Sequence, residues 1–74
     1  MAKYSRGDLF SRKGTRDTTP MVVSDVRYES YGDVTYRLAN IRHPNDEELM
    51  VEVSESAINE IYDCIKRNEV REKK

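Results

Sequence analysis

Two β-prone segments separated by a short polar turn place the strongest constraint on the fold of this chain. Residues 21–28 (MVVSDVRY) and 34–39 (VTYRLA) are rich in Val, Tyr and Thr, and the connection between them carries Gly32 and Asp33. β-Branched and aromatic side chains suit a pleated sheet, and glycine readily adopts the positive φ that many tight hairpin connections need. Residues 21–39 are therefore predicted to form a β-hairpin on which the other elements pack.

Shorter β-prone segments flank this hairpin on both sides. Residues 7–12 are predicted to form a first strand, and a long polar loop over residues 13–20 joins that strand to the hairpin. Residues 48–53 (ELMVEV) alternate in polarity, which predicts a fourth strand with Met50 on its outward side.

The second strand lacks a clean alternation. Met21, Val23 and Val26 can all point inward only if the strand contains a bulge near Ser24 and Asp25. We favour this bulge because it brings three apolar side chains to the same core. The predicted inward set is Leu9 or Phe10, Val23, Val26, Val34, Tyr36, Leu38, Leu49, Val51, Val53, Ile58, Ile61 and Ile65.

The C-terminal part of the chain has the pattern of one amphipathic helix. At 100° per residue, apolar side chains share one side of a helix over residues 55–68, and charged side chains share the other. Ser54 or Ser56 can cap the first turn, because a hydroxyl accepts a hydrogen bond from a free backbone amide. Cys64 lies on the apolar side and is expected to be a small core residue rather than a reactive thiol. Residues 69–74 are predicted to be a frayed, charged tail.

Length and composition restrict the class of protein. The chain has 74 residues with one cysteine and one histidine, so we expect one small domain over residues 7–68 without a disulfide, a metal site or a cofactor. No apolar run approaches the ~18 residues of a membrane span, and residues 1–6 lack a signal-peptide pattern. We therefore expect a flexible leader over residues 1–6 and a cytoplasmic protein. So small a domain has little core and can gain stability by self-association.

These parts predict a mainly β fold with a C-terminal α-helix (α+β). Their order resembles that of small SH3-like barrels: residues 7–10 read Gly-Asp-Leu-Phe, a long loop follows, and residues 20–26 read Pro-Met-Val-Val-Ser-Asp-Val before the hairpin. Over residues 7–53 the chain is similar to Tudor- or KOW-like proteins of bacteria and their phages. The resemblance implies a small barrel or bent antiparallel sheet that acts by binding and has no catalytic residue. The predicted helix departs from the minimal barrel, which usually ends in a short strand after a single helical turn.

Nucleic acid is one partner that the charge pattern would allow. The net charge is −1, but residues 1–20 hold five cations against two acids, whereas residues 21–53 hold three cations against seven acids. Cations attract phosphates and exposed aromatic rings stack on bases, while the acidic middle of the chain opposes such binding. The candidate nucleic-acid-binding residues are Arg12, Lys13, Arg16, Arg27 and Arg37.

A protein partner, either a second copy or another protein, is the favoured alternative. Tyr31 in the hairpin turn, Met50 on a possible edge strand and Tyr62 at the margin of the helix are the candidate contacts, because exposed Tyr and Met are common at interfaces. The compact, charge-rich chain is also compatible with a phage or prophage accessory protein. Catalysis is not expected, since His43 lies in a polar turn without a nucleophile in register and no glycine-rich phosphate loop is present.

Overall fold

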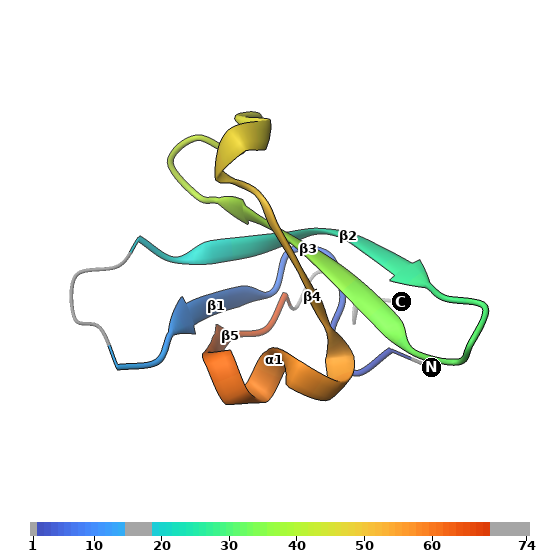
Figure 1. Cartoon of the computed structure of the whole chain (residues 1–74). Helices are drawn as coiled ribbons and strands as arrows, with labels where there is room; N and C mark the ends of the chain where they lie inside the picture. Colours follow the sequence, from blue (N-terminus) through green and yellow to red (C-terminus); the bar gives the residue numbers. More distant parts are fainter. Residues whose placement is uncertain (1, 15–18, 69–74) are drawn as a thin grey trace.

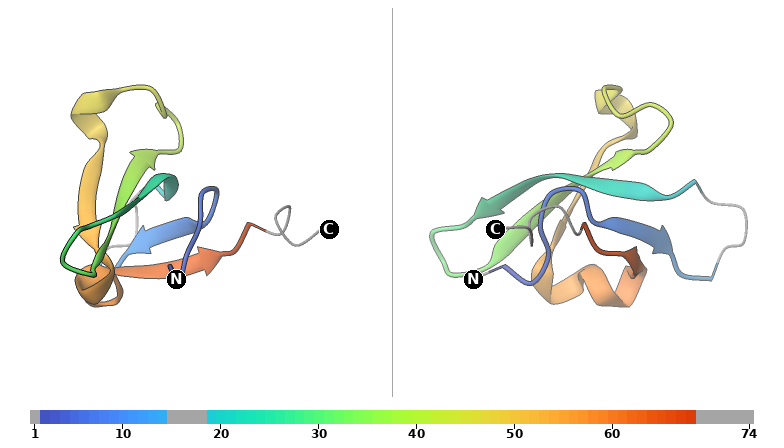
Figure 2. Two further views of the ribbon diagram at one scale, coloured as in Figure 1. Left: turned by 90° about the vertical axis from the view of Figure 1, so that its right-hand side faces the viewer. Right: turned by 180° about the vertical axis from the view of Figure 1, so that it is seen from behind.

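The computed structural model describes residues 2–14 and 19–68, so the predicted frayed tail over residues 69–74 lies outside the described residues. In this part of the chain the elements are β1 (Leu9–Arg12), β2 (Met21–Tyr28), β3 (Val34–Asn40), the short 3-10 helix η1 (Glu47–Leu49), β4 (Val51–Ser54), α1 (Glu55–Ile61) and β5 (Tyr62–Lys66). The strands form one open antiparallel sheet in the order β4-β3-β2-β1-β5. The sheet curves strongly, and α1 connects its two ends (Figures 1 and 2). The mainly β, α+β class is therefore confirmed.

The central hairpin is confirmed together with its irregular strand. Gly32 has a φ of +94°, and the amide of Glu29 donates to the carbonyl of Asp33 at 2.9 Å, which closes the turn. The pairing of β2 with β3 shifts register between Val23 and Asp25. This shift is the predicted bulge, and it allows Val23 to be buried in the core.

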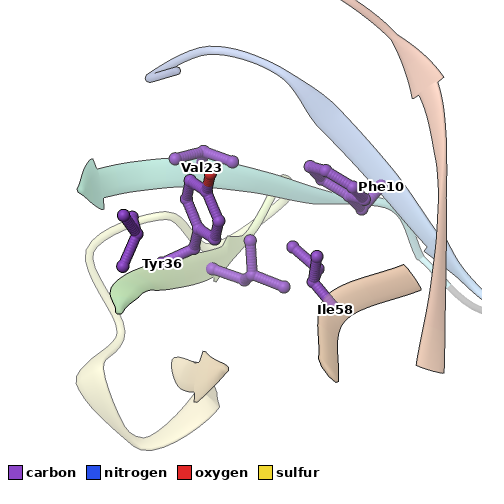
Figure 3. Packing of buried hydrophobic residues seen from close by; sticks show 6 residues of the cluster. Phe10, Val23, Tyr36 and Ile58 are labelled. Atoms are coloured by element: carbon purple, nitrogen blue, oxygen red, sulfur yellow. The ribbon is translucent and has the colours of Figure 1, made fainter. Parts of the chain in front are cut away.

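The core lies on one side of the sheet and is small. Tyr36 of β3 and Phe10 of β1 are fully buried, and Ile58 of α1 packs beside them (Figure 3). The apolar surface that these side chains remove from water supplies the main stabilising free energy, at roughly 25 cal/mol per Å². The buried cluster consists of Phe10, Val23, Val34, Tyr36, Leu38 and Ile58.

The predicted helix over residues 55–68 is wrong beyond Ile61. The helix ends there, the backbone is already extended at Tyr62 with φ −128° and ψ 156°, and residues 62–66 form β5 along β1. A strand in this position pairs the free edge of β1, whose backbone groups a helix would leave without partners. Tyr62 and Cys64 both pack against the core. Because they are two residues apart, they can share one face of a strand as well as a broad apolar face of a helix, so their spacing did not distinguish the two.

Several side chains predicted to point inward are exposed. The exposed fraction is 40% for Ile61, 52% for Ile65, 40% for Leu49 and 39% for Val51. Leu49 belongs to η1, and β4 begins at Val51 rather than at residue 48. The carboxylate of Asp46 accepts a hydrogen bond from an amide of η1 at 3.0 Å, so this cap favours a helical turn where alternation alone predicted a strand.

The segment over residues 1–6, predicted to be a flexible leader, packs on the core from residue 2 onward. The ring of Tyr4 makes edge-to-face contacts with Phe10 and Tyr36, with centroids 4.8 and 5.7 Å away. Its amide donates to the Tyr36 hydroxyl at 3.1 Å, and its own hydroxyl donates to Asn59 at 2.8 Å. Tyr4 thus connects the N-terminal segment to β3 and α1.

The helix gives a direct test of this packing. Replacing Ile58, which is fully buried, with Ala should lower the free energy of unfolding by about 3 kcal/mol, because it leaves a cavity among the core residues. Ile61→Ala is the matched control in the same helix, and because Ile61 is 40% exposed its effect should stay within about 1 kcal/mol. Urea unfolding measures both. Equal losses would contradict the described orientation of α1.

Candidate binding surface

The side of the sheet opposite the core carries a cluster of charges. Arg37 pairs in register with Glu52, and Arg27 pairs with Thr35, so these side chains alternate with core residues and point away from the core. Arg27 makes ion pairs with Glu29 at 2.9 Å and Glu52 at 3.2 Å, and Arg37 makes one with Glu52 at 3.3 Å. We call Arg27, Glu29, Arg37 and Glu52 the outer charged cluster. Its two positive and two negative charges balance.

Hydrogen bonds within this cluster shift the pKa values of Arg27, Glu29 and Glu52. Thr35 and Arg27 donate to Glu29 and lower its pKa, and the hydrogen bond from Arg27 lowers the pKa of Glu52. The same carboxylates, with Glu52 first, raise the pKa of the Arg27 guanidinium above its usual value. Arg27, Glu29 and Glu52 are therefore charged at neutral pH. Because they are solvent-exposed, these ion pairs contribute more to the electrostatic character of the surface than to stability.

The candidate nucleic-acid-binding residues fall into two places. The arginines at positions 27 and 37 belong to the outer charged cluster, where carboxylates offset their charge. Arg12 ends β1, and Lys13 follows it with its Nζ 3.7 Å from a carboxylate oxygen of Asp63. Arg16 lies outside the described residues. The ion pairs weaken the positive potential that phosphate binding requires.

The candidate protein-binding residues also lie apart. Tyr31 is 73% exposed in the turn between β2 and β3, whereas Met50 follows η1 at the other end of β3. Tyr62 is half-buried at the start of β5 and packs against the core, so core packing accounts for much of its surface. A hollow of about 230 Å³ beside the outer charged cluster is lined by Arg37, Glu47, Met50 and Glu52.

Met50 belongs to an apolar segment at the edge of the sheet, which we call the β4 edge segment (residues 49–53, LMVEV). β4 ends the sheet and pairs only with β3 among the described strands. Leu49 and Val51 are 40% and 39% exposed, and Met50 between them is partly exposed. The only charge in this segment is that of Glu52, which the arginines of the outer charged cluster offset.

Sequence reasoning found Met50 but missed its neighbours. Strict alternation assigned Leu49 and Val51 to the core. Leu49 instead ends η1, and Val51 begins the edge strand β4, beside which only β3 lies among the described strands. The signal that could have found the segment is its composition. The segment has three consecutive apolar residues, a single charge at Glu52 and no proline. Such a composition is typical of a strand that pairs readily with another strand.

Comparisons with protein-family models, curated proteins and solved structures found no match for this chain. Within residues 2–14 and 19–68, no helix is long and apolar enough to cross a membrane. In the same part of the chain, no group of three or more His, Cys, Asp or Glu side chains is placed to hold a metal ion. The function is therefore inferred from the arrangement of this chain's own surface.

The outer charged cluster predicts a pH-dependent effect of Glu52→Gln. Because the folded protein lowers the pKa of Glu52 below its usual value of 4.5, the ionised carboxylate stabilises the fold above pH 4.5, and this contribution is lost as the pH falls through the lowered pKa. The variant should therefore have a slightly lower midpoint of thermal unfolding at pH 7, and the difference should shrink in acid. Glu60→Gln, exposed on α1, is the control for removing a charge. Equal effects of both variants at pH 7 would argue against the cluster.

Proposed function

We propose that this protein is a small non-enzymatic binding module whose partner is another polypeptide. The observation that carries the proposal is the β4 edge segment, in which exposed apolar side chains lie beside a charged cluster without net charge. Protein interfaces combine an apolar centre with a polar rim, and charge is depleted at their centre. A surface that binds phosphates would instead present cations in excess.

The SH3-like relationship belongs to the same proposal. β5 lies beside β1, and a short helix separates it from β4, which supports an open barrel that ends in a short strand after a helical segment. Such a scaffold offers its loops and edges for binding and carries no catalytic group. A cytoplasmic location and a role as a phage or prophage accessory protein remain predictions.

Nucleic acid is the second candidate partner, and one observation favours it. Tyr28 and Tyr31 are 64% and 73% exposed near the end of the hairpin, where their rings are free to stack on bases. The predicted phosphate contacts Arg12 and Lys13 lie near the start of β2, at the opposite end of that strand from these rings, and Arg16 lies outside the described residues. We rank this candidate second because carboxylates offset Arg27, Arg37 and Lys13.

Binding measurements on the purified protein separate the two candidates. Fluorescence anisotropy with mixed-sequence single-stranded DNA and RNA should show no binding tighter than about 100 μM at a salt concentration of about 0.15 M. A protein partner captured from lysate should be retained after nuclease treatment and lost with Met50→Glu, because an unpaired charge in a contact is costly.

Two variants serve as controls. Replacing Arg12, Lys13 and Arg16 together with Ala should leave the protein complex intact, as should Glu60→Gln on α1. Micromolar nucleic-acid binding that falls steeply with salt and disappears in the triple variant would overturn the proposal in favour of the second candidate.

A further inference from the structure

We propose that the β4 edge segment binds an extended peptide segment in which apolar residues alternate with lysine or arginine, and that this segment pairs with β4 as a further strand of the sheet. The inference rests on the proposed function as a polypeptide-binding module and names the chemistry of the partner. Apolar side chains of the partner lie beside Val51 and Val53, and a basic side chain enters the hollow beside Met50.

The backbone of β4 makes a further strand possible. In an antiparallel sheet, alternate residues of a strand direct their N–H and C=O groups toward opposite neighbours. Among residues 2–14 and 19–68, β4 has β3 on one side and no strand on the other, so half of its backbone polar groups point to an open edge. A row of such groups is a template for an extended peptide.

The two faces of β4 differ in chemistry. Val51 and Val53 pair with core residues of β3, and Val51 remains 39% exposed at the edge. Glu52 lies between them and pairs with Arg37 on the outer side of the sheet. Because side chains of a strand alternate between its faces, a peptide beside β4 presents every second residue to the valines, which select apolar side chains.

The hollow of about 230 Å³ determines what the other residues of the peptide meet. It lies on the outer side, where it is lined by Arg37, Glu47, Met50 and Glu52. Lysine and arginine can lay their methylene groups along an apolar side chain while their charged end remains in water or contacts a carboxylate. Met50 supplies the apolar side chain, and Glu47 supplies the carboxylate.

The charge at the hollow favours a cation over an anion. Arginines and carboxylates balance within the outer charged cluster, so Glu47 determines the net charge of the lining. Among the residues that the structure describes, no cation forms an ion pair with Glu47. Residues 44–54 hold four acids and no lysine or arginine. The hollow therefore attracts a basic side chain of the partner and repels an acidic one.

The same pattern opposes a second copy of β4 as the partner. β4 reads Val-Glu-Val-Ser, so its apolar residues alternate with an acidic and a neutral residue rather than with basic ones. Pairing of two such strands would bring Glu52 of one copy toward the negative surroundings of the hollow in the other, and like charges on paired strands repel. The charge pattern therefore selects a different polypeptide.

Isothermal titration calorimetry of the full chain with synthetic peptides tests the inference. A capped peptide of alternating valine and lysine, about seven residues long, should bind with a Kd of about 100 μM at about 0.15 M salt, because the interface is small. The same peptide with glutamate in place of lysine should bind at least about 5-fold more weakly, because its carboxylates meet Glu47.

Methylation of the peptide's amides tests the strand pairing. One valine–lysine peptide carries methylated amides at its valines, and another carries them at its lysines. Only one of the two peptides should lose binding, because only alternate amides of a strand face its neighbour. Equal affinities of the two methylated peptides would contradict the pairing with β4.

A charge-reversal variant tests the hollow itself. Glu47→Lys should weaken binding of the valine–lysine peptide at least about 5-fold and strengthen binding of the valine–glutamate peptide. Glu60→Lys makes the same charge change at an exposed position of α1, and it should leave both affinities within about twofold of the unaltered chain. A reversed preference requires a folded protein, so misfolding of Glu47→Lys cannot imitate it.

Three results would overturn the inference. The first is binding of neither peptide, in which case capture of a protein from lysate decides the proposed function independently. The second is equal affinity of the unaltered chain for both peptides. The third is a change of preference in Glu60→Lys as large as that in Glu47→Lys, which would assign the preference to the net charge of the protein.

Discussion

The carboxylate of Asp8 is fully buried between the N-terminal segment and the end of β5. It accepts hydrogen bonds from the amide of Ser5 at 3.0 Å, from the amide of Asn68 at 2.6 Å and from Nε of Arg67 at 3.2 Å. Burial of a carboxylate costs several kcal/mol unless charge and hydrogen bonds offset it. The three donors must therefore be in place together, which fixes the turn before β1 against the residues that follow β5.

This anchor organises both ends of the described chain. Arg67 also donates to the carbonyl of Lys3 at 3.0 Å and lies over the ring of Tyr4, with its guanidinium carbon 5.3 Å from the centroid. Gly7 adopts a φ of +94°, and a Cβ there would collide with the side chain of Asn68. The N-terminal segment thus depends on β5, which in turn depends on pairing with β1.

Tyr36 links the N-terminal segment to the core and to α1. Its hydroxyl accepts the amide of Tyr4 at 3.1 Å and donates to Glu55 at 3.0 Å, and the same carboxylate oxygen accepts the amide of Lys3 at 2.7 Å. Burial, reinforced by the nearby carboxylate, raises the pKa of Tyr36 to about 12. A core with few apolar side chains is thereby supplemented by a polar network that spans β3, α1 and the N-terminal segment.

Those parts of the fold that depend on neighbouring residues could be predicted from the sequence. Gly32 and the flanking β-prone residues predicted the hairpin, and the broken alternation before Val26 predicted the bulge. Contacts between residues far apart in the sequence left no local signal. The spacing of Tyr62 and Cys64 fits both a helix and a strand, so it could not identify β5. No residue near Asp8 in the sequence indicates that Arg67 and Asn68, after β5, donate hydrogen bonds to its carboxylate. The same limit applied to the candidate binding surface. Its exposed arginines were predicted from alternation, but their carboxylate partner on β4 depends on strand register.

Equilibrium unfolding of Asp8→Ala in urea, beside Asp63→Ala, tests the role of this anchor. Asp8→Ala removes the acceptor of two backbone amides and one guanidinium and should lower the free energy of unfolding by at least about 2 kcal/mol. Asp63→Ala should change the free energy of unfolding by no more than about 0.5 kcal/mol, because the side chain of Asp63 is 66% exposed. A loss for Asp8→Ala as small as that for Asp63→Ala would contradict the dependence of the fold on the buried carboxylate.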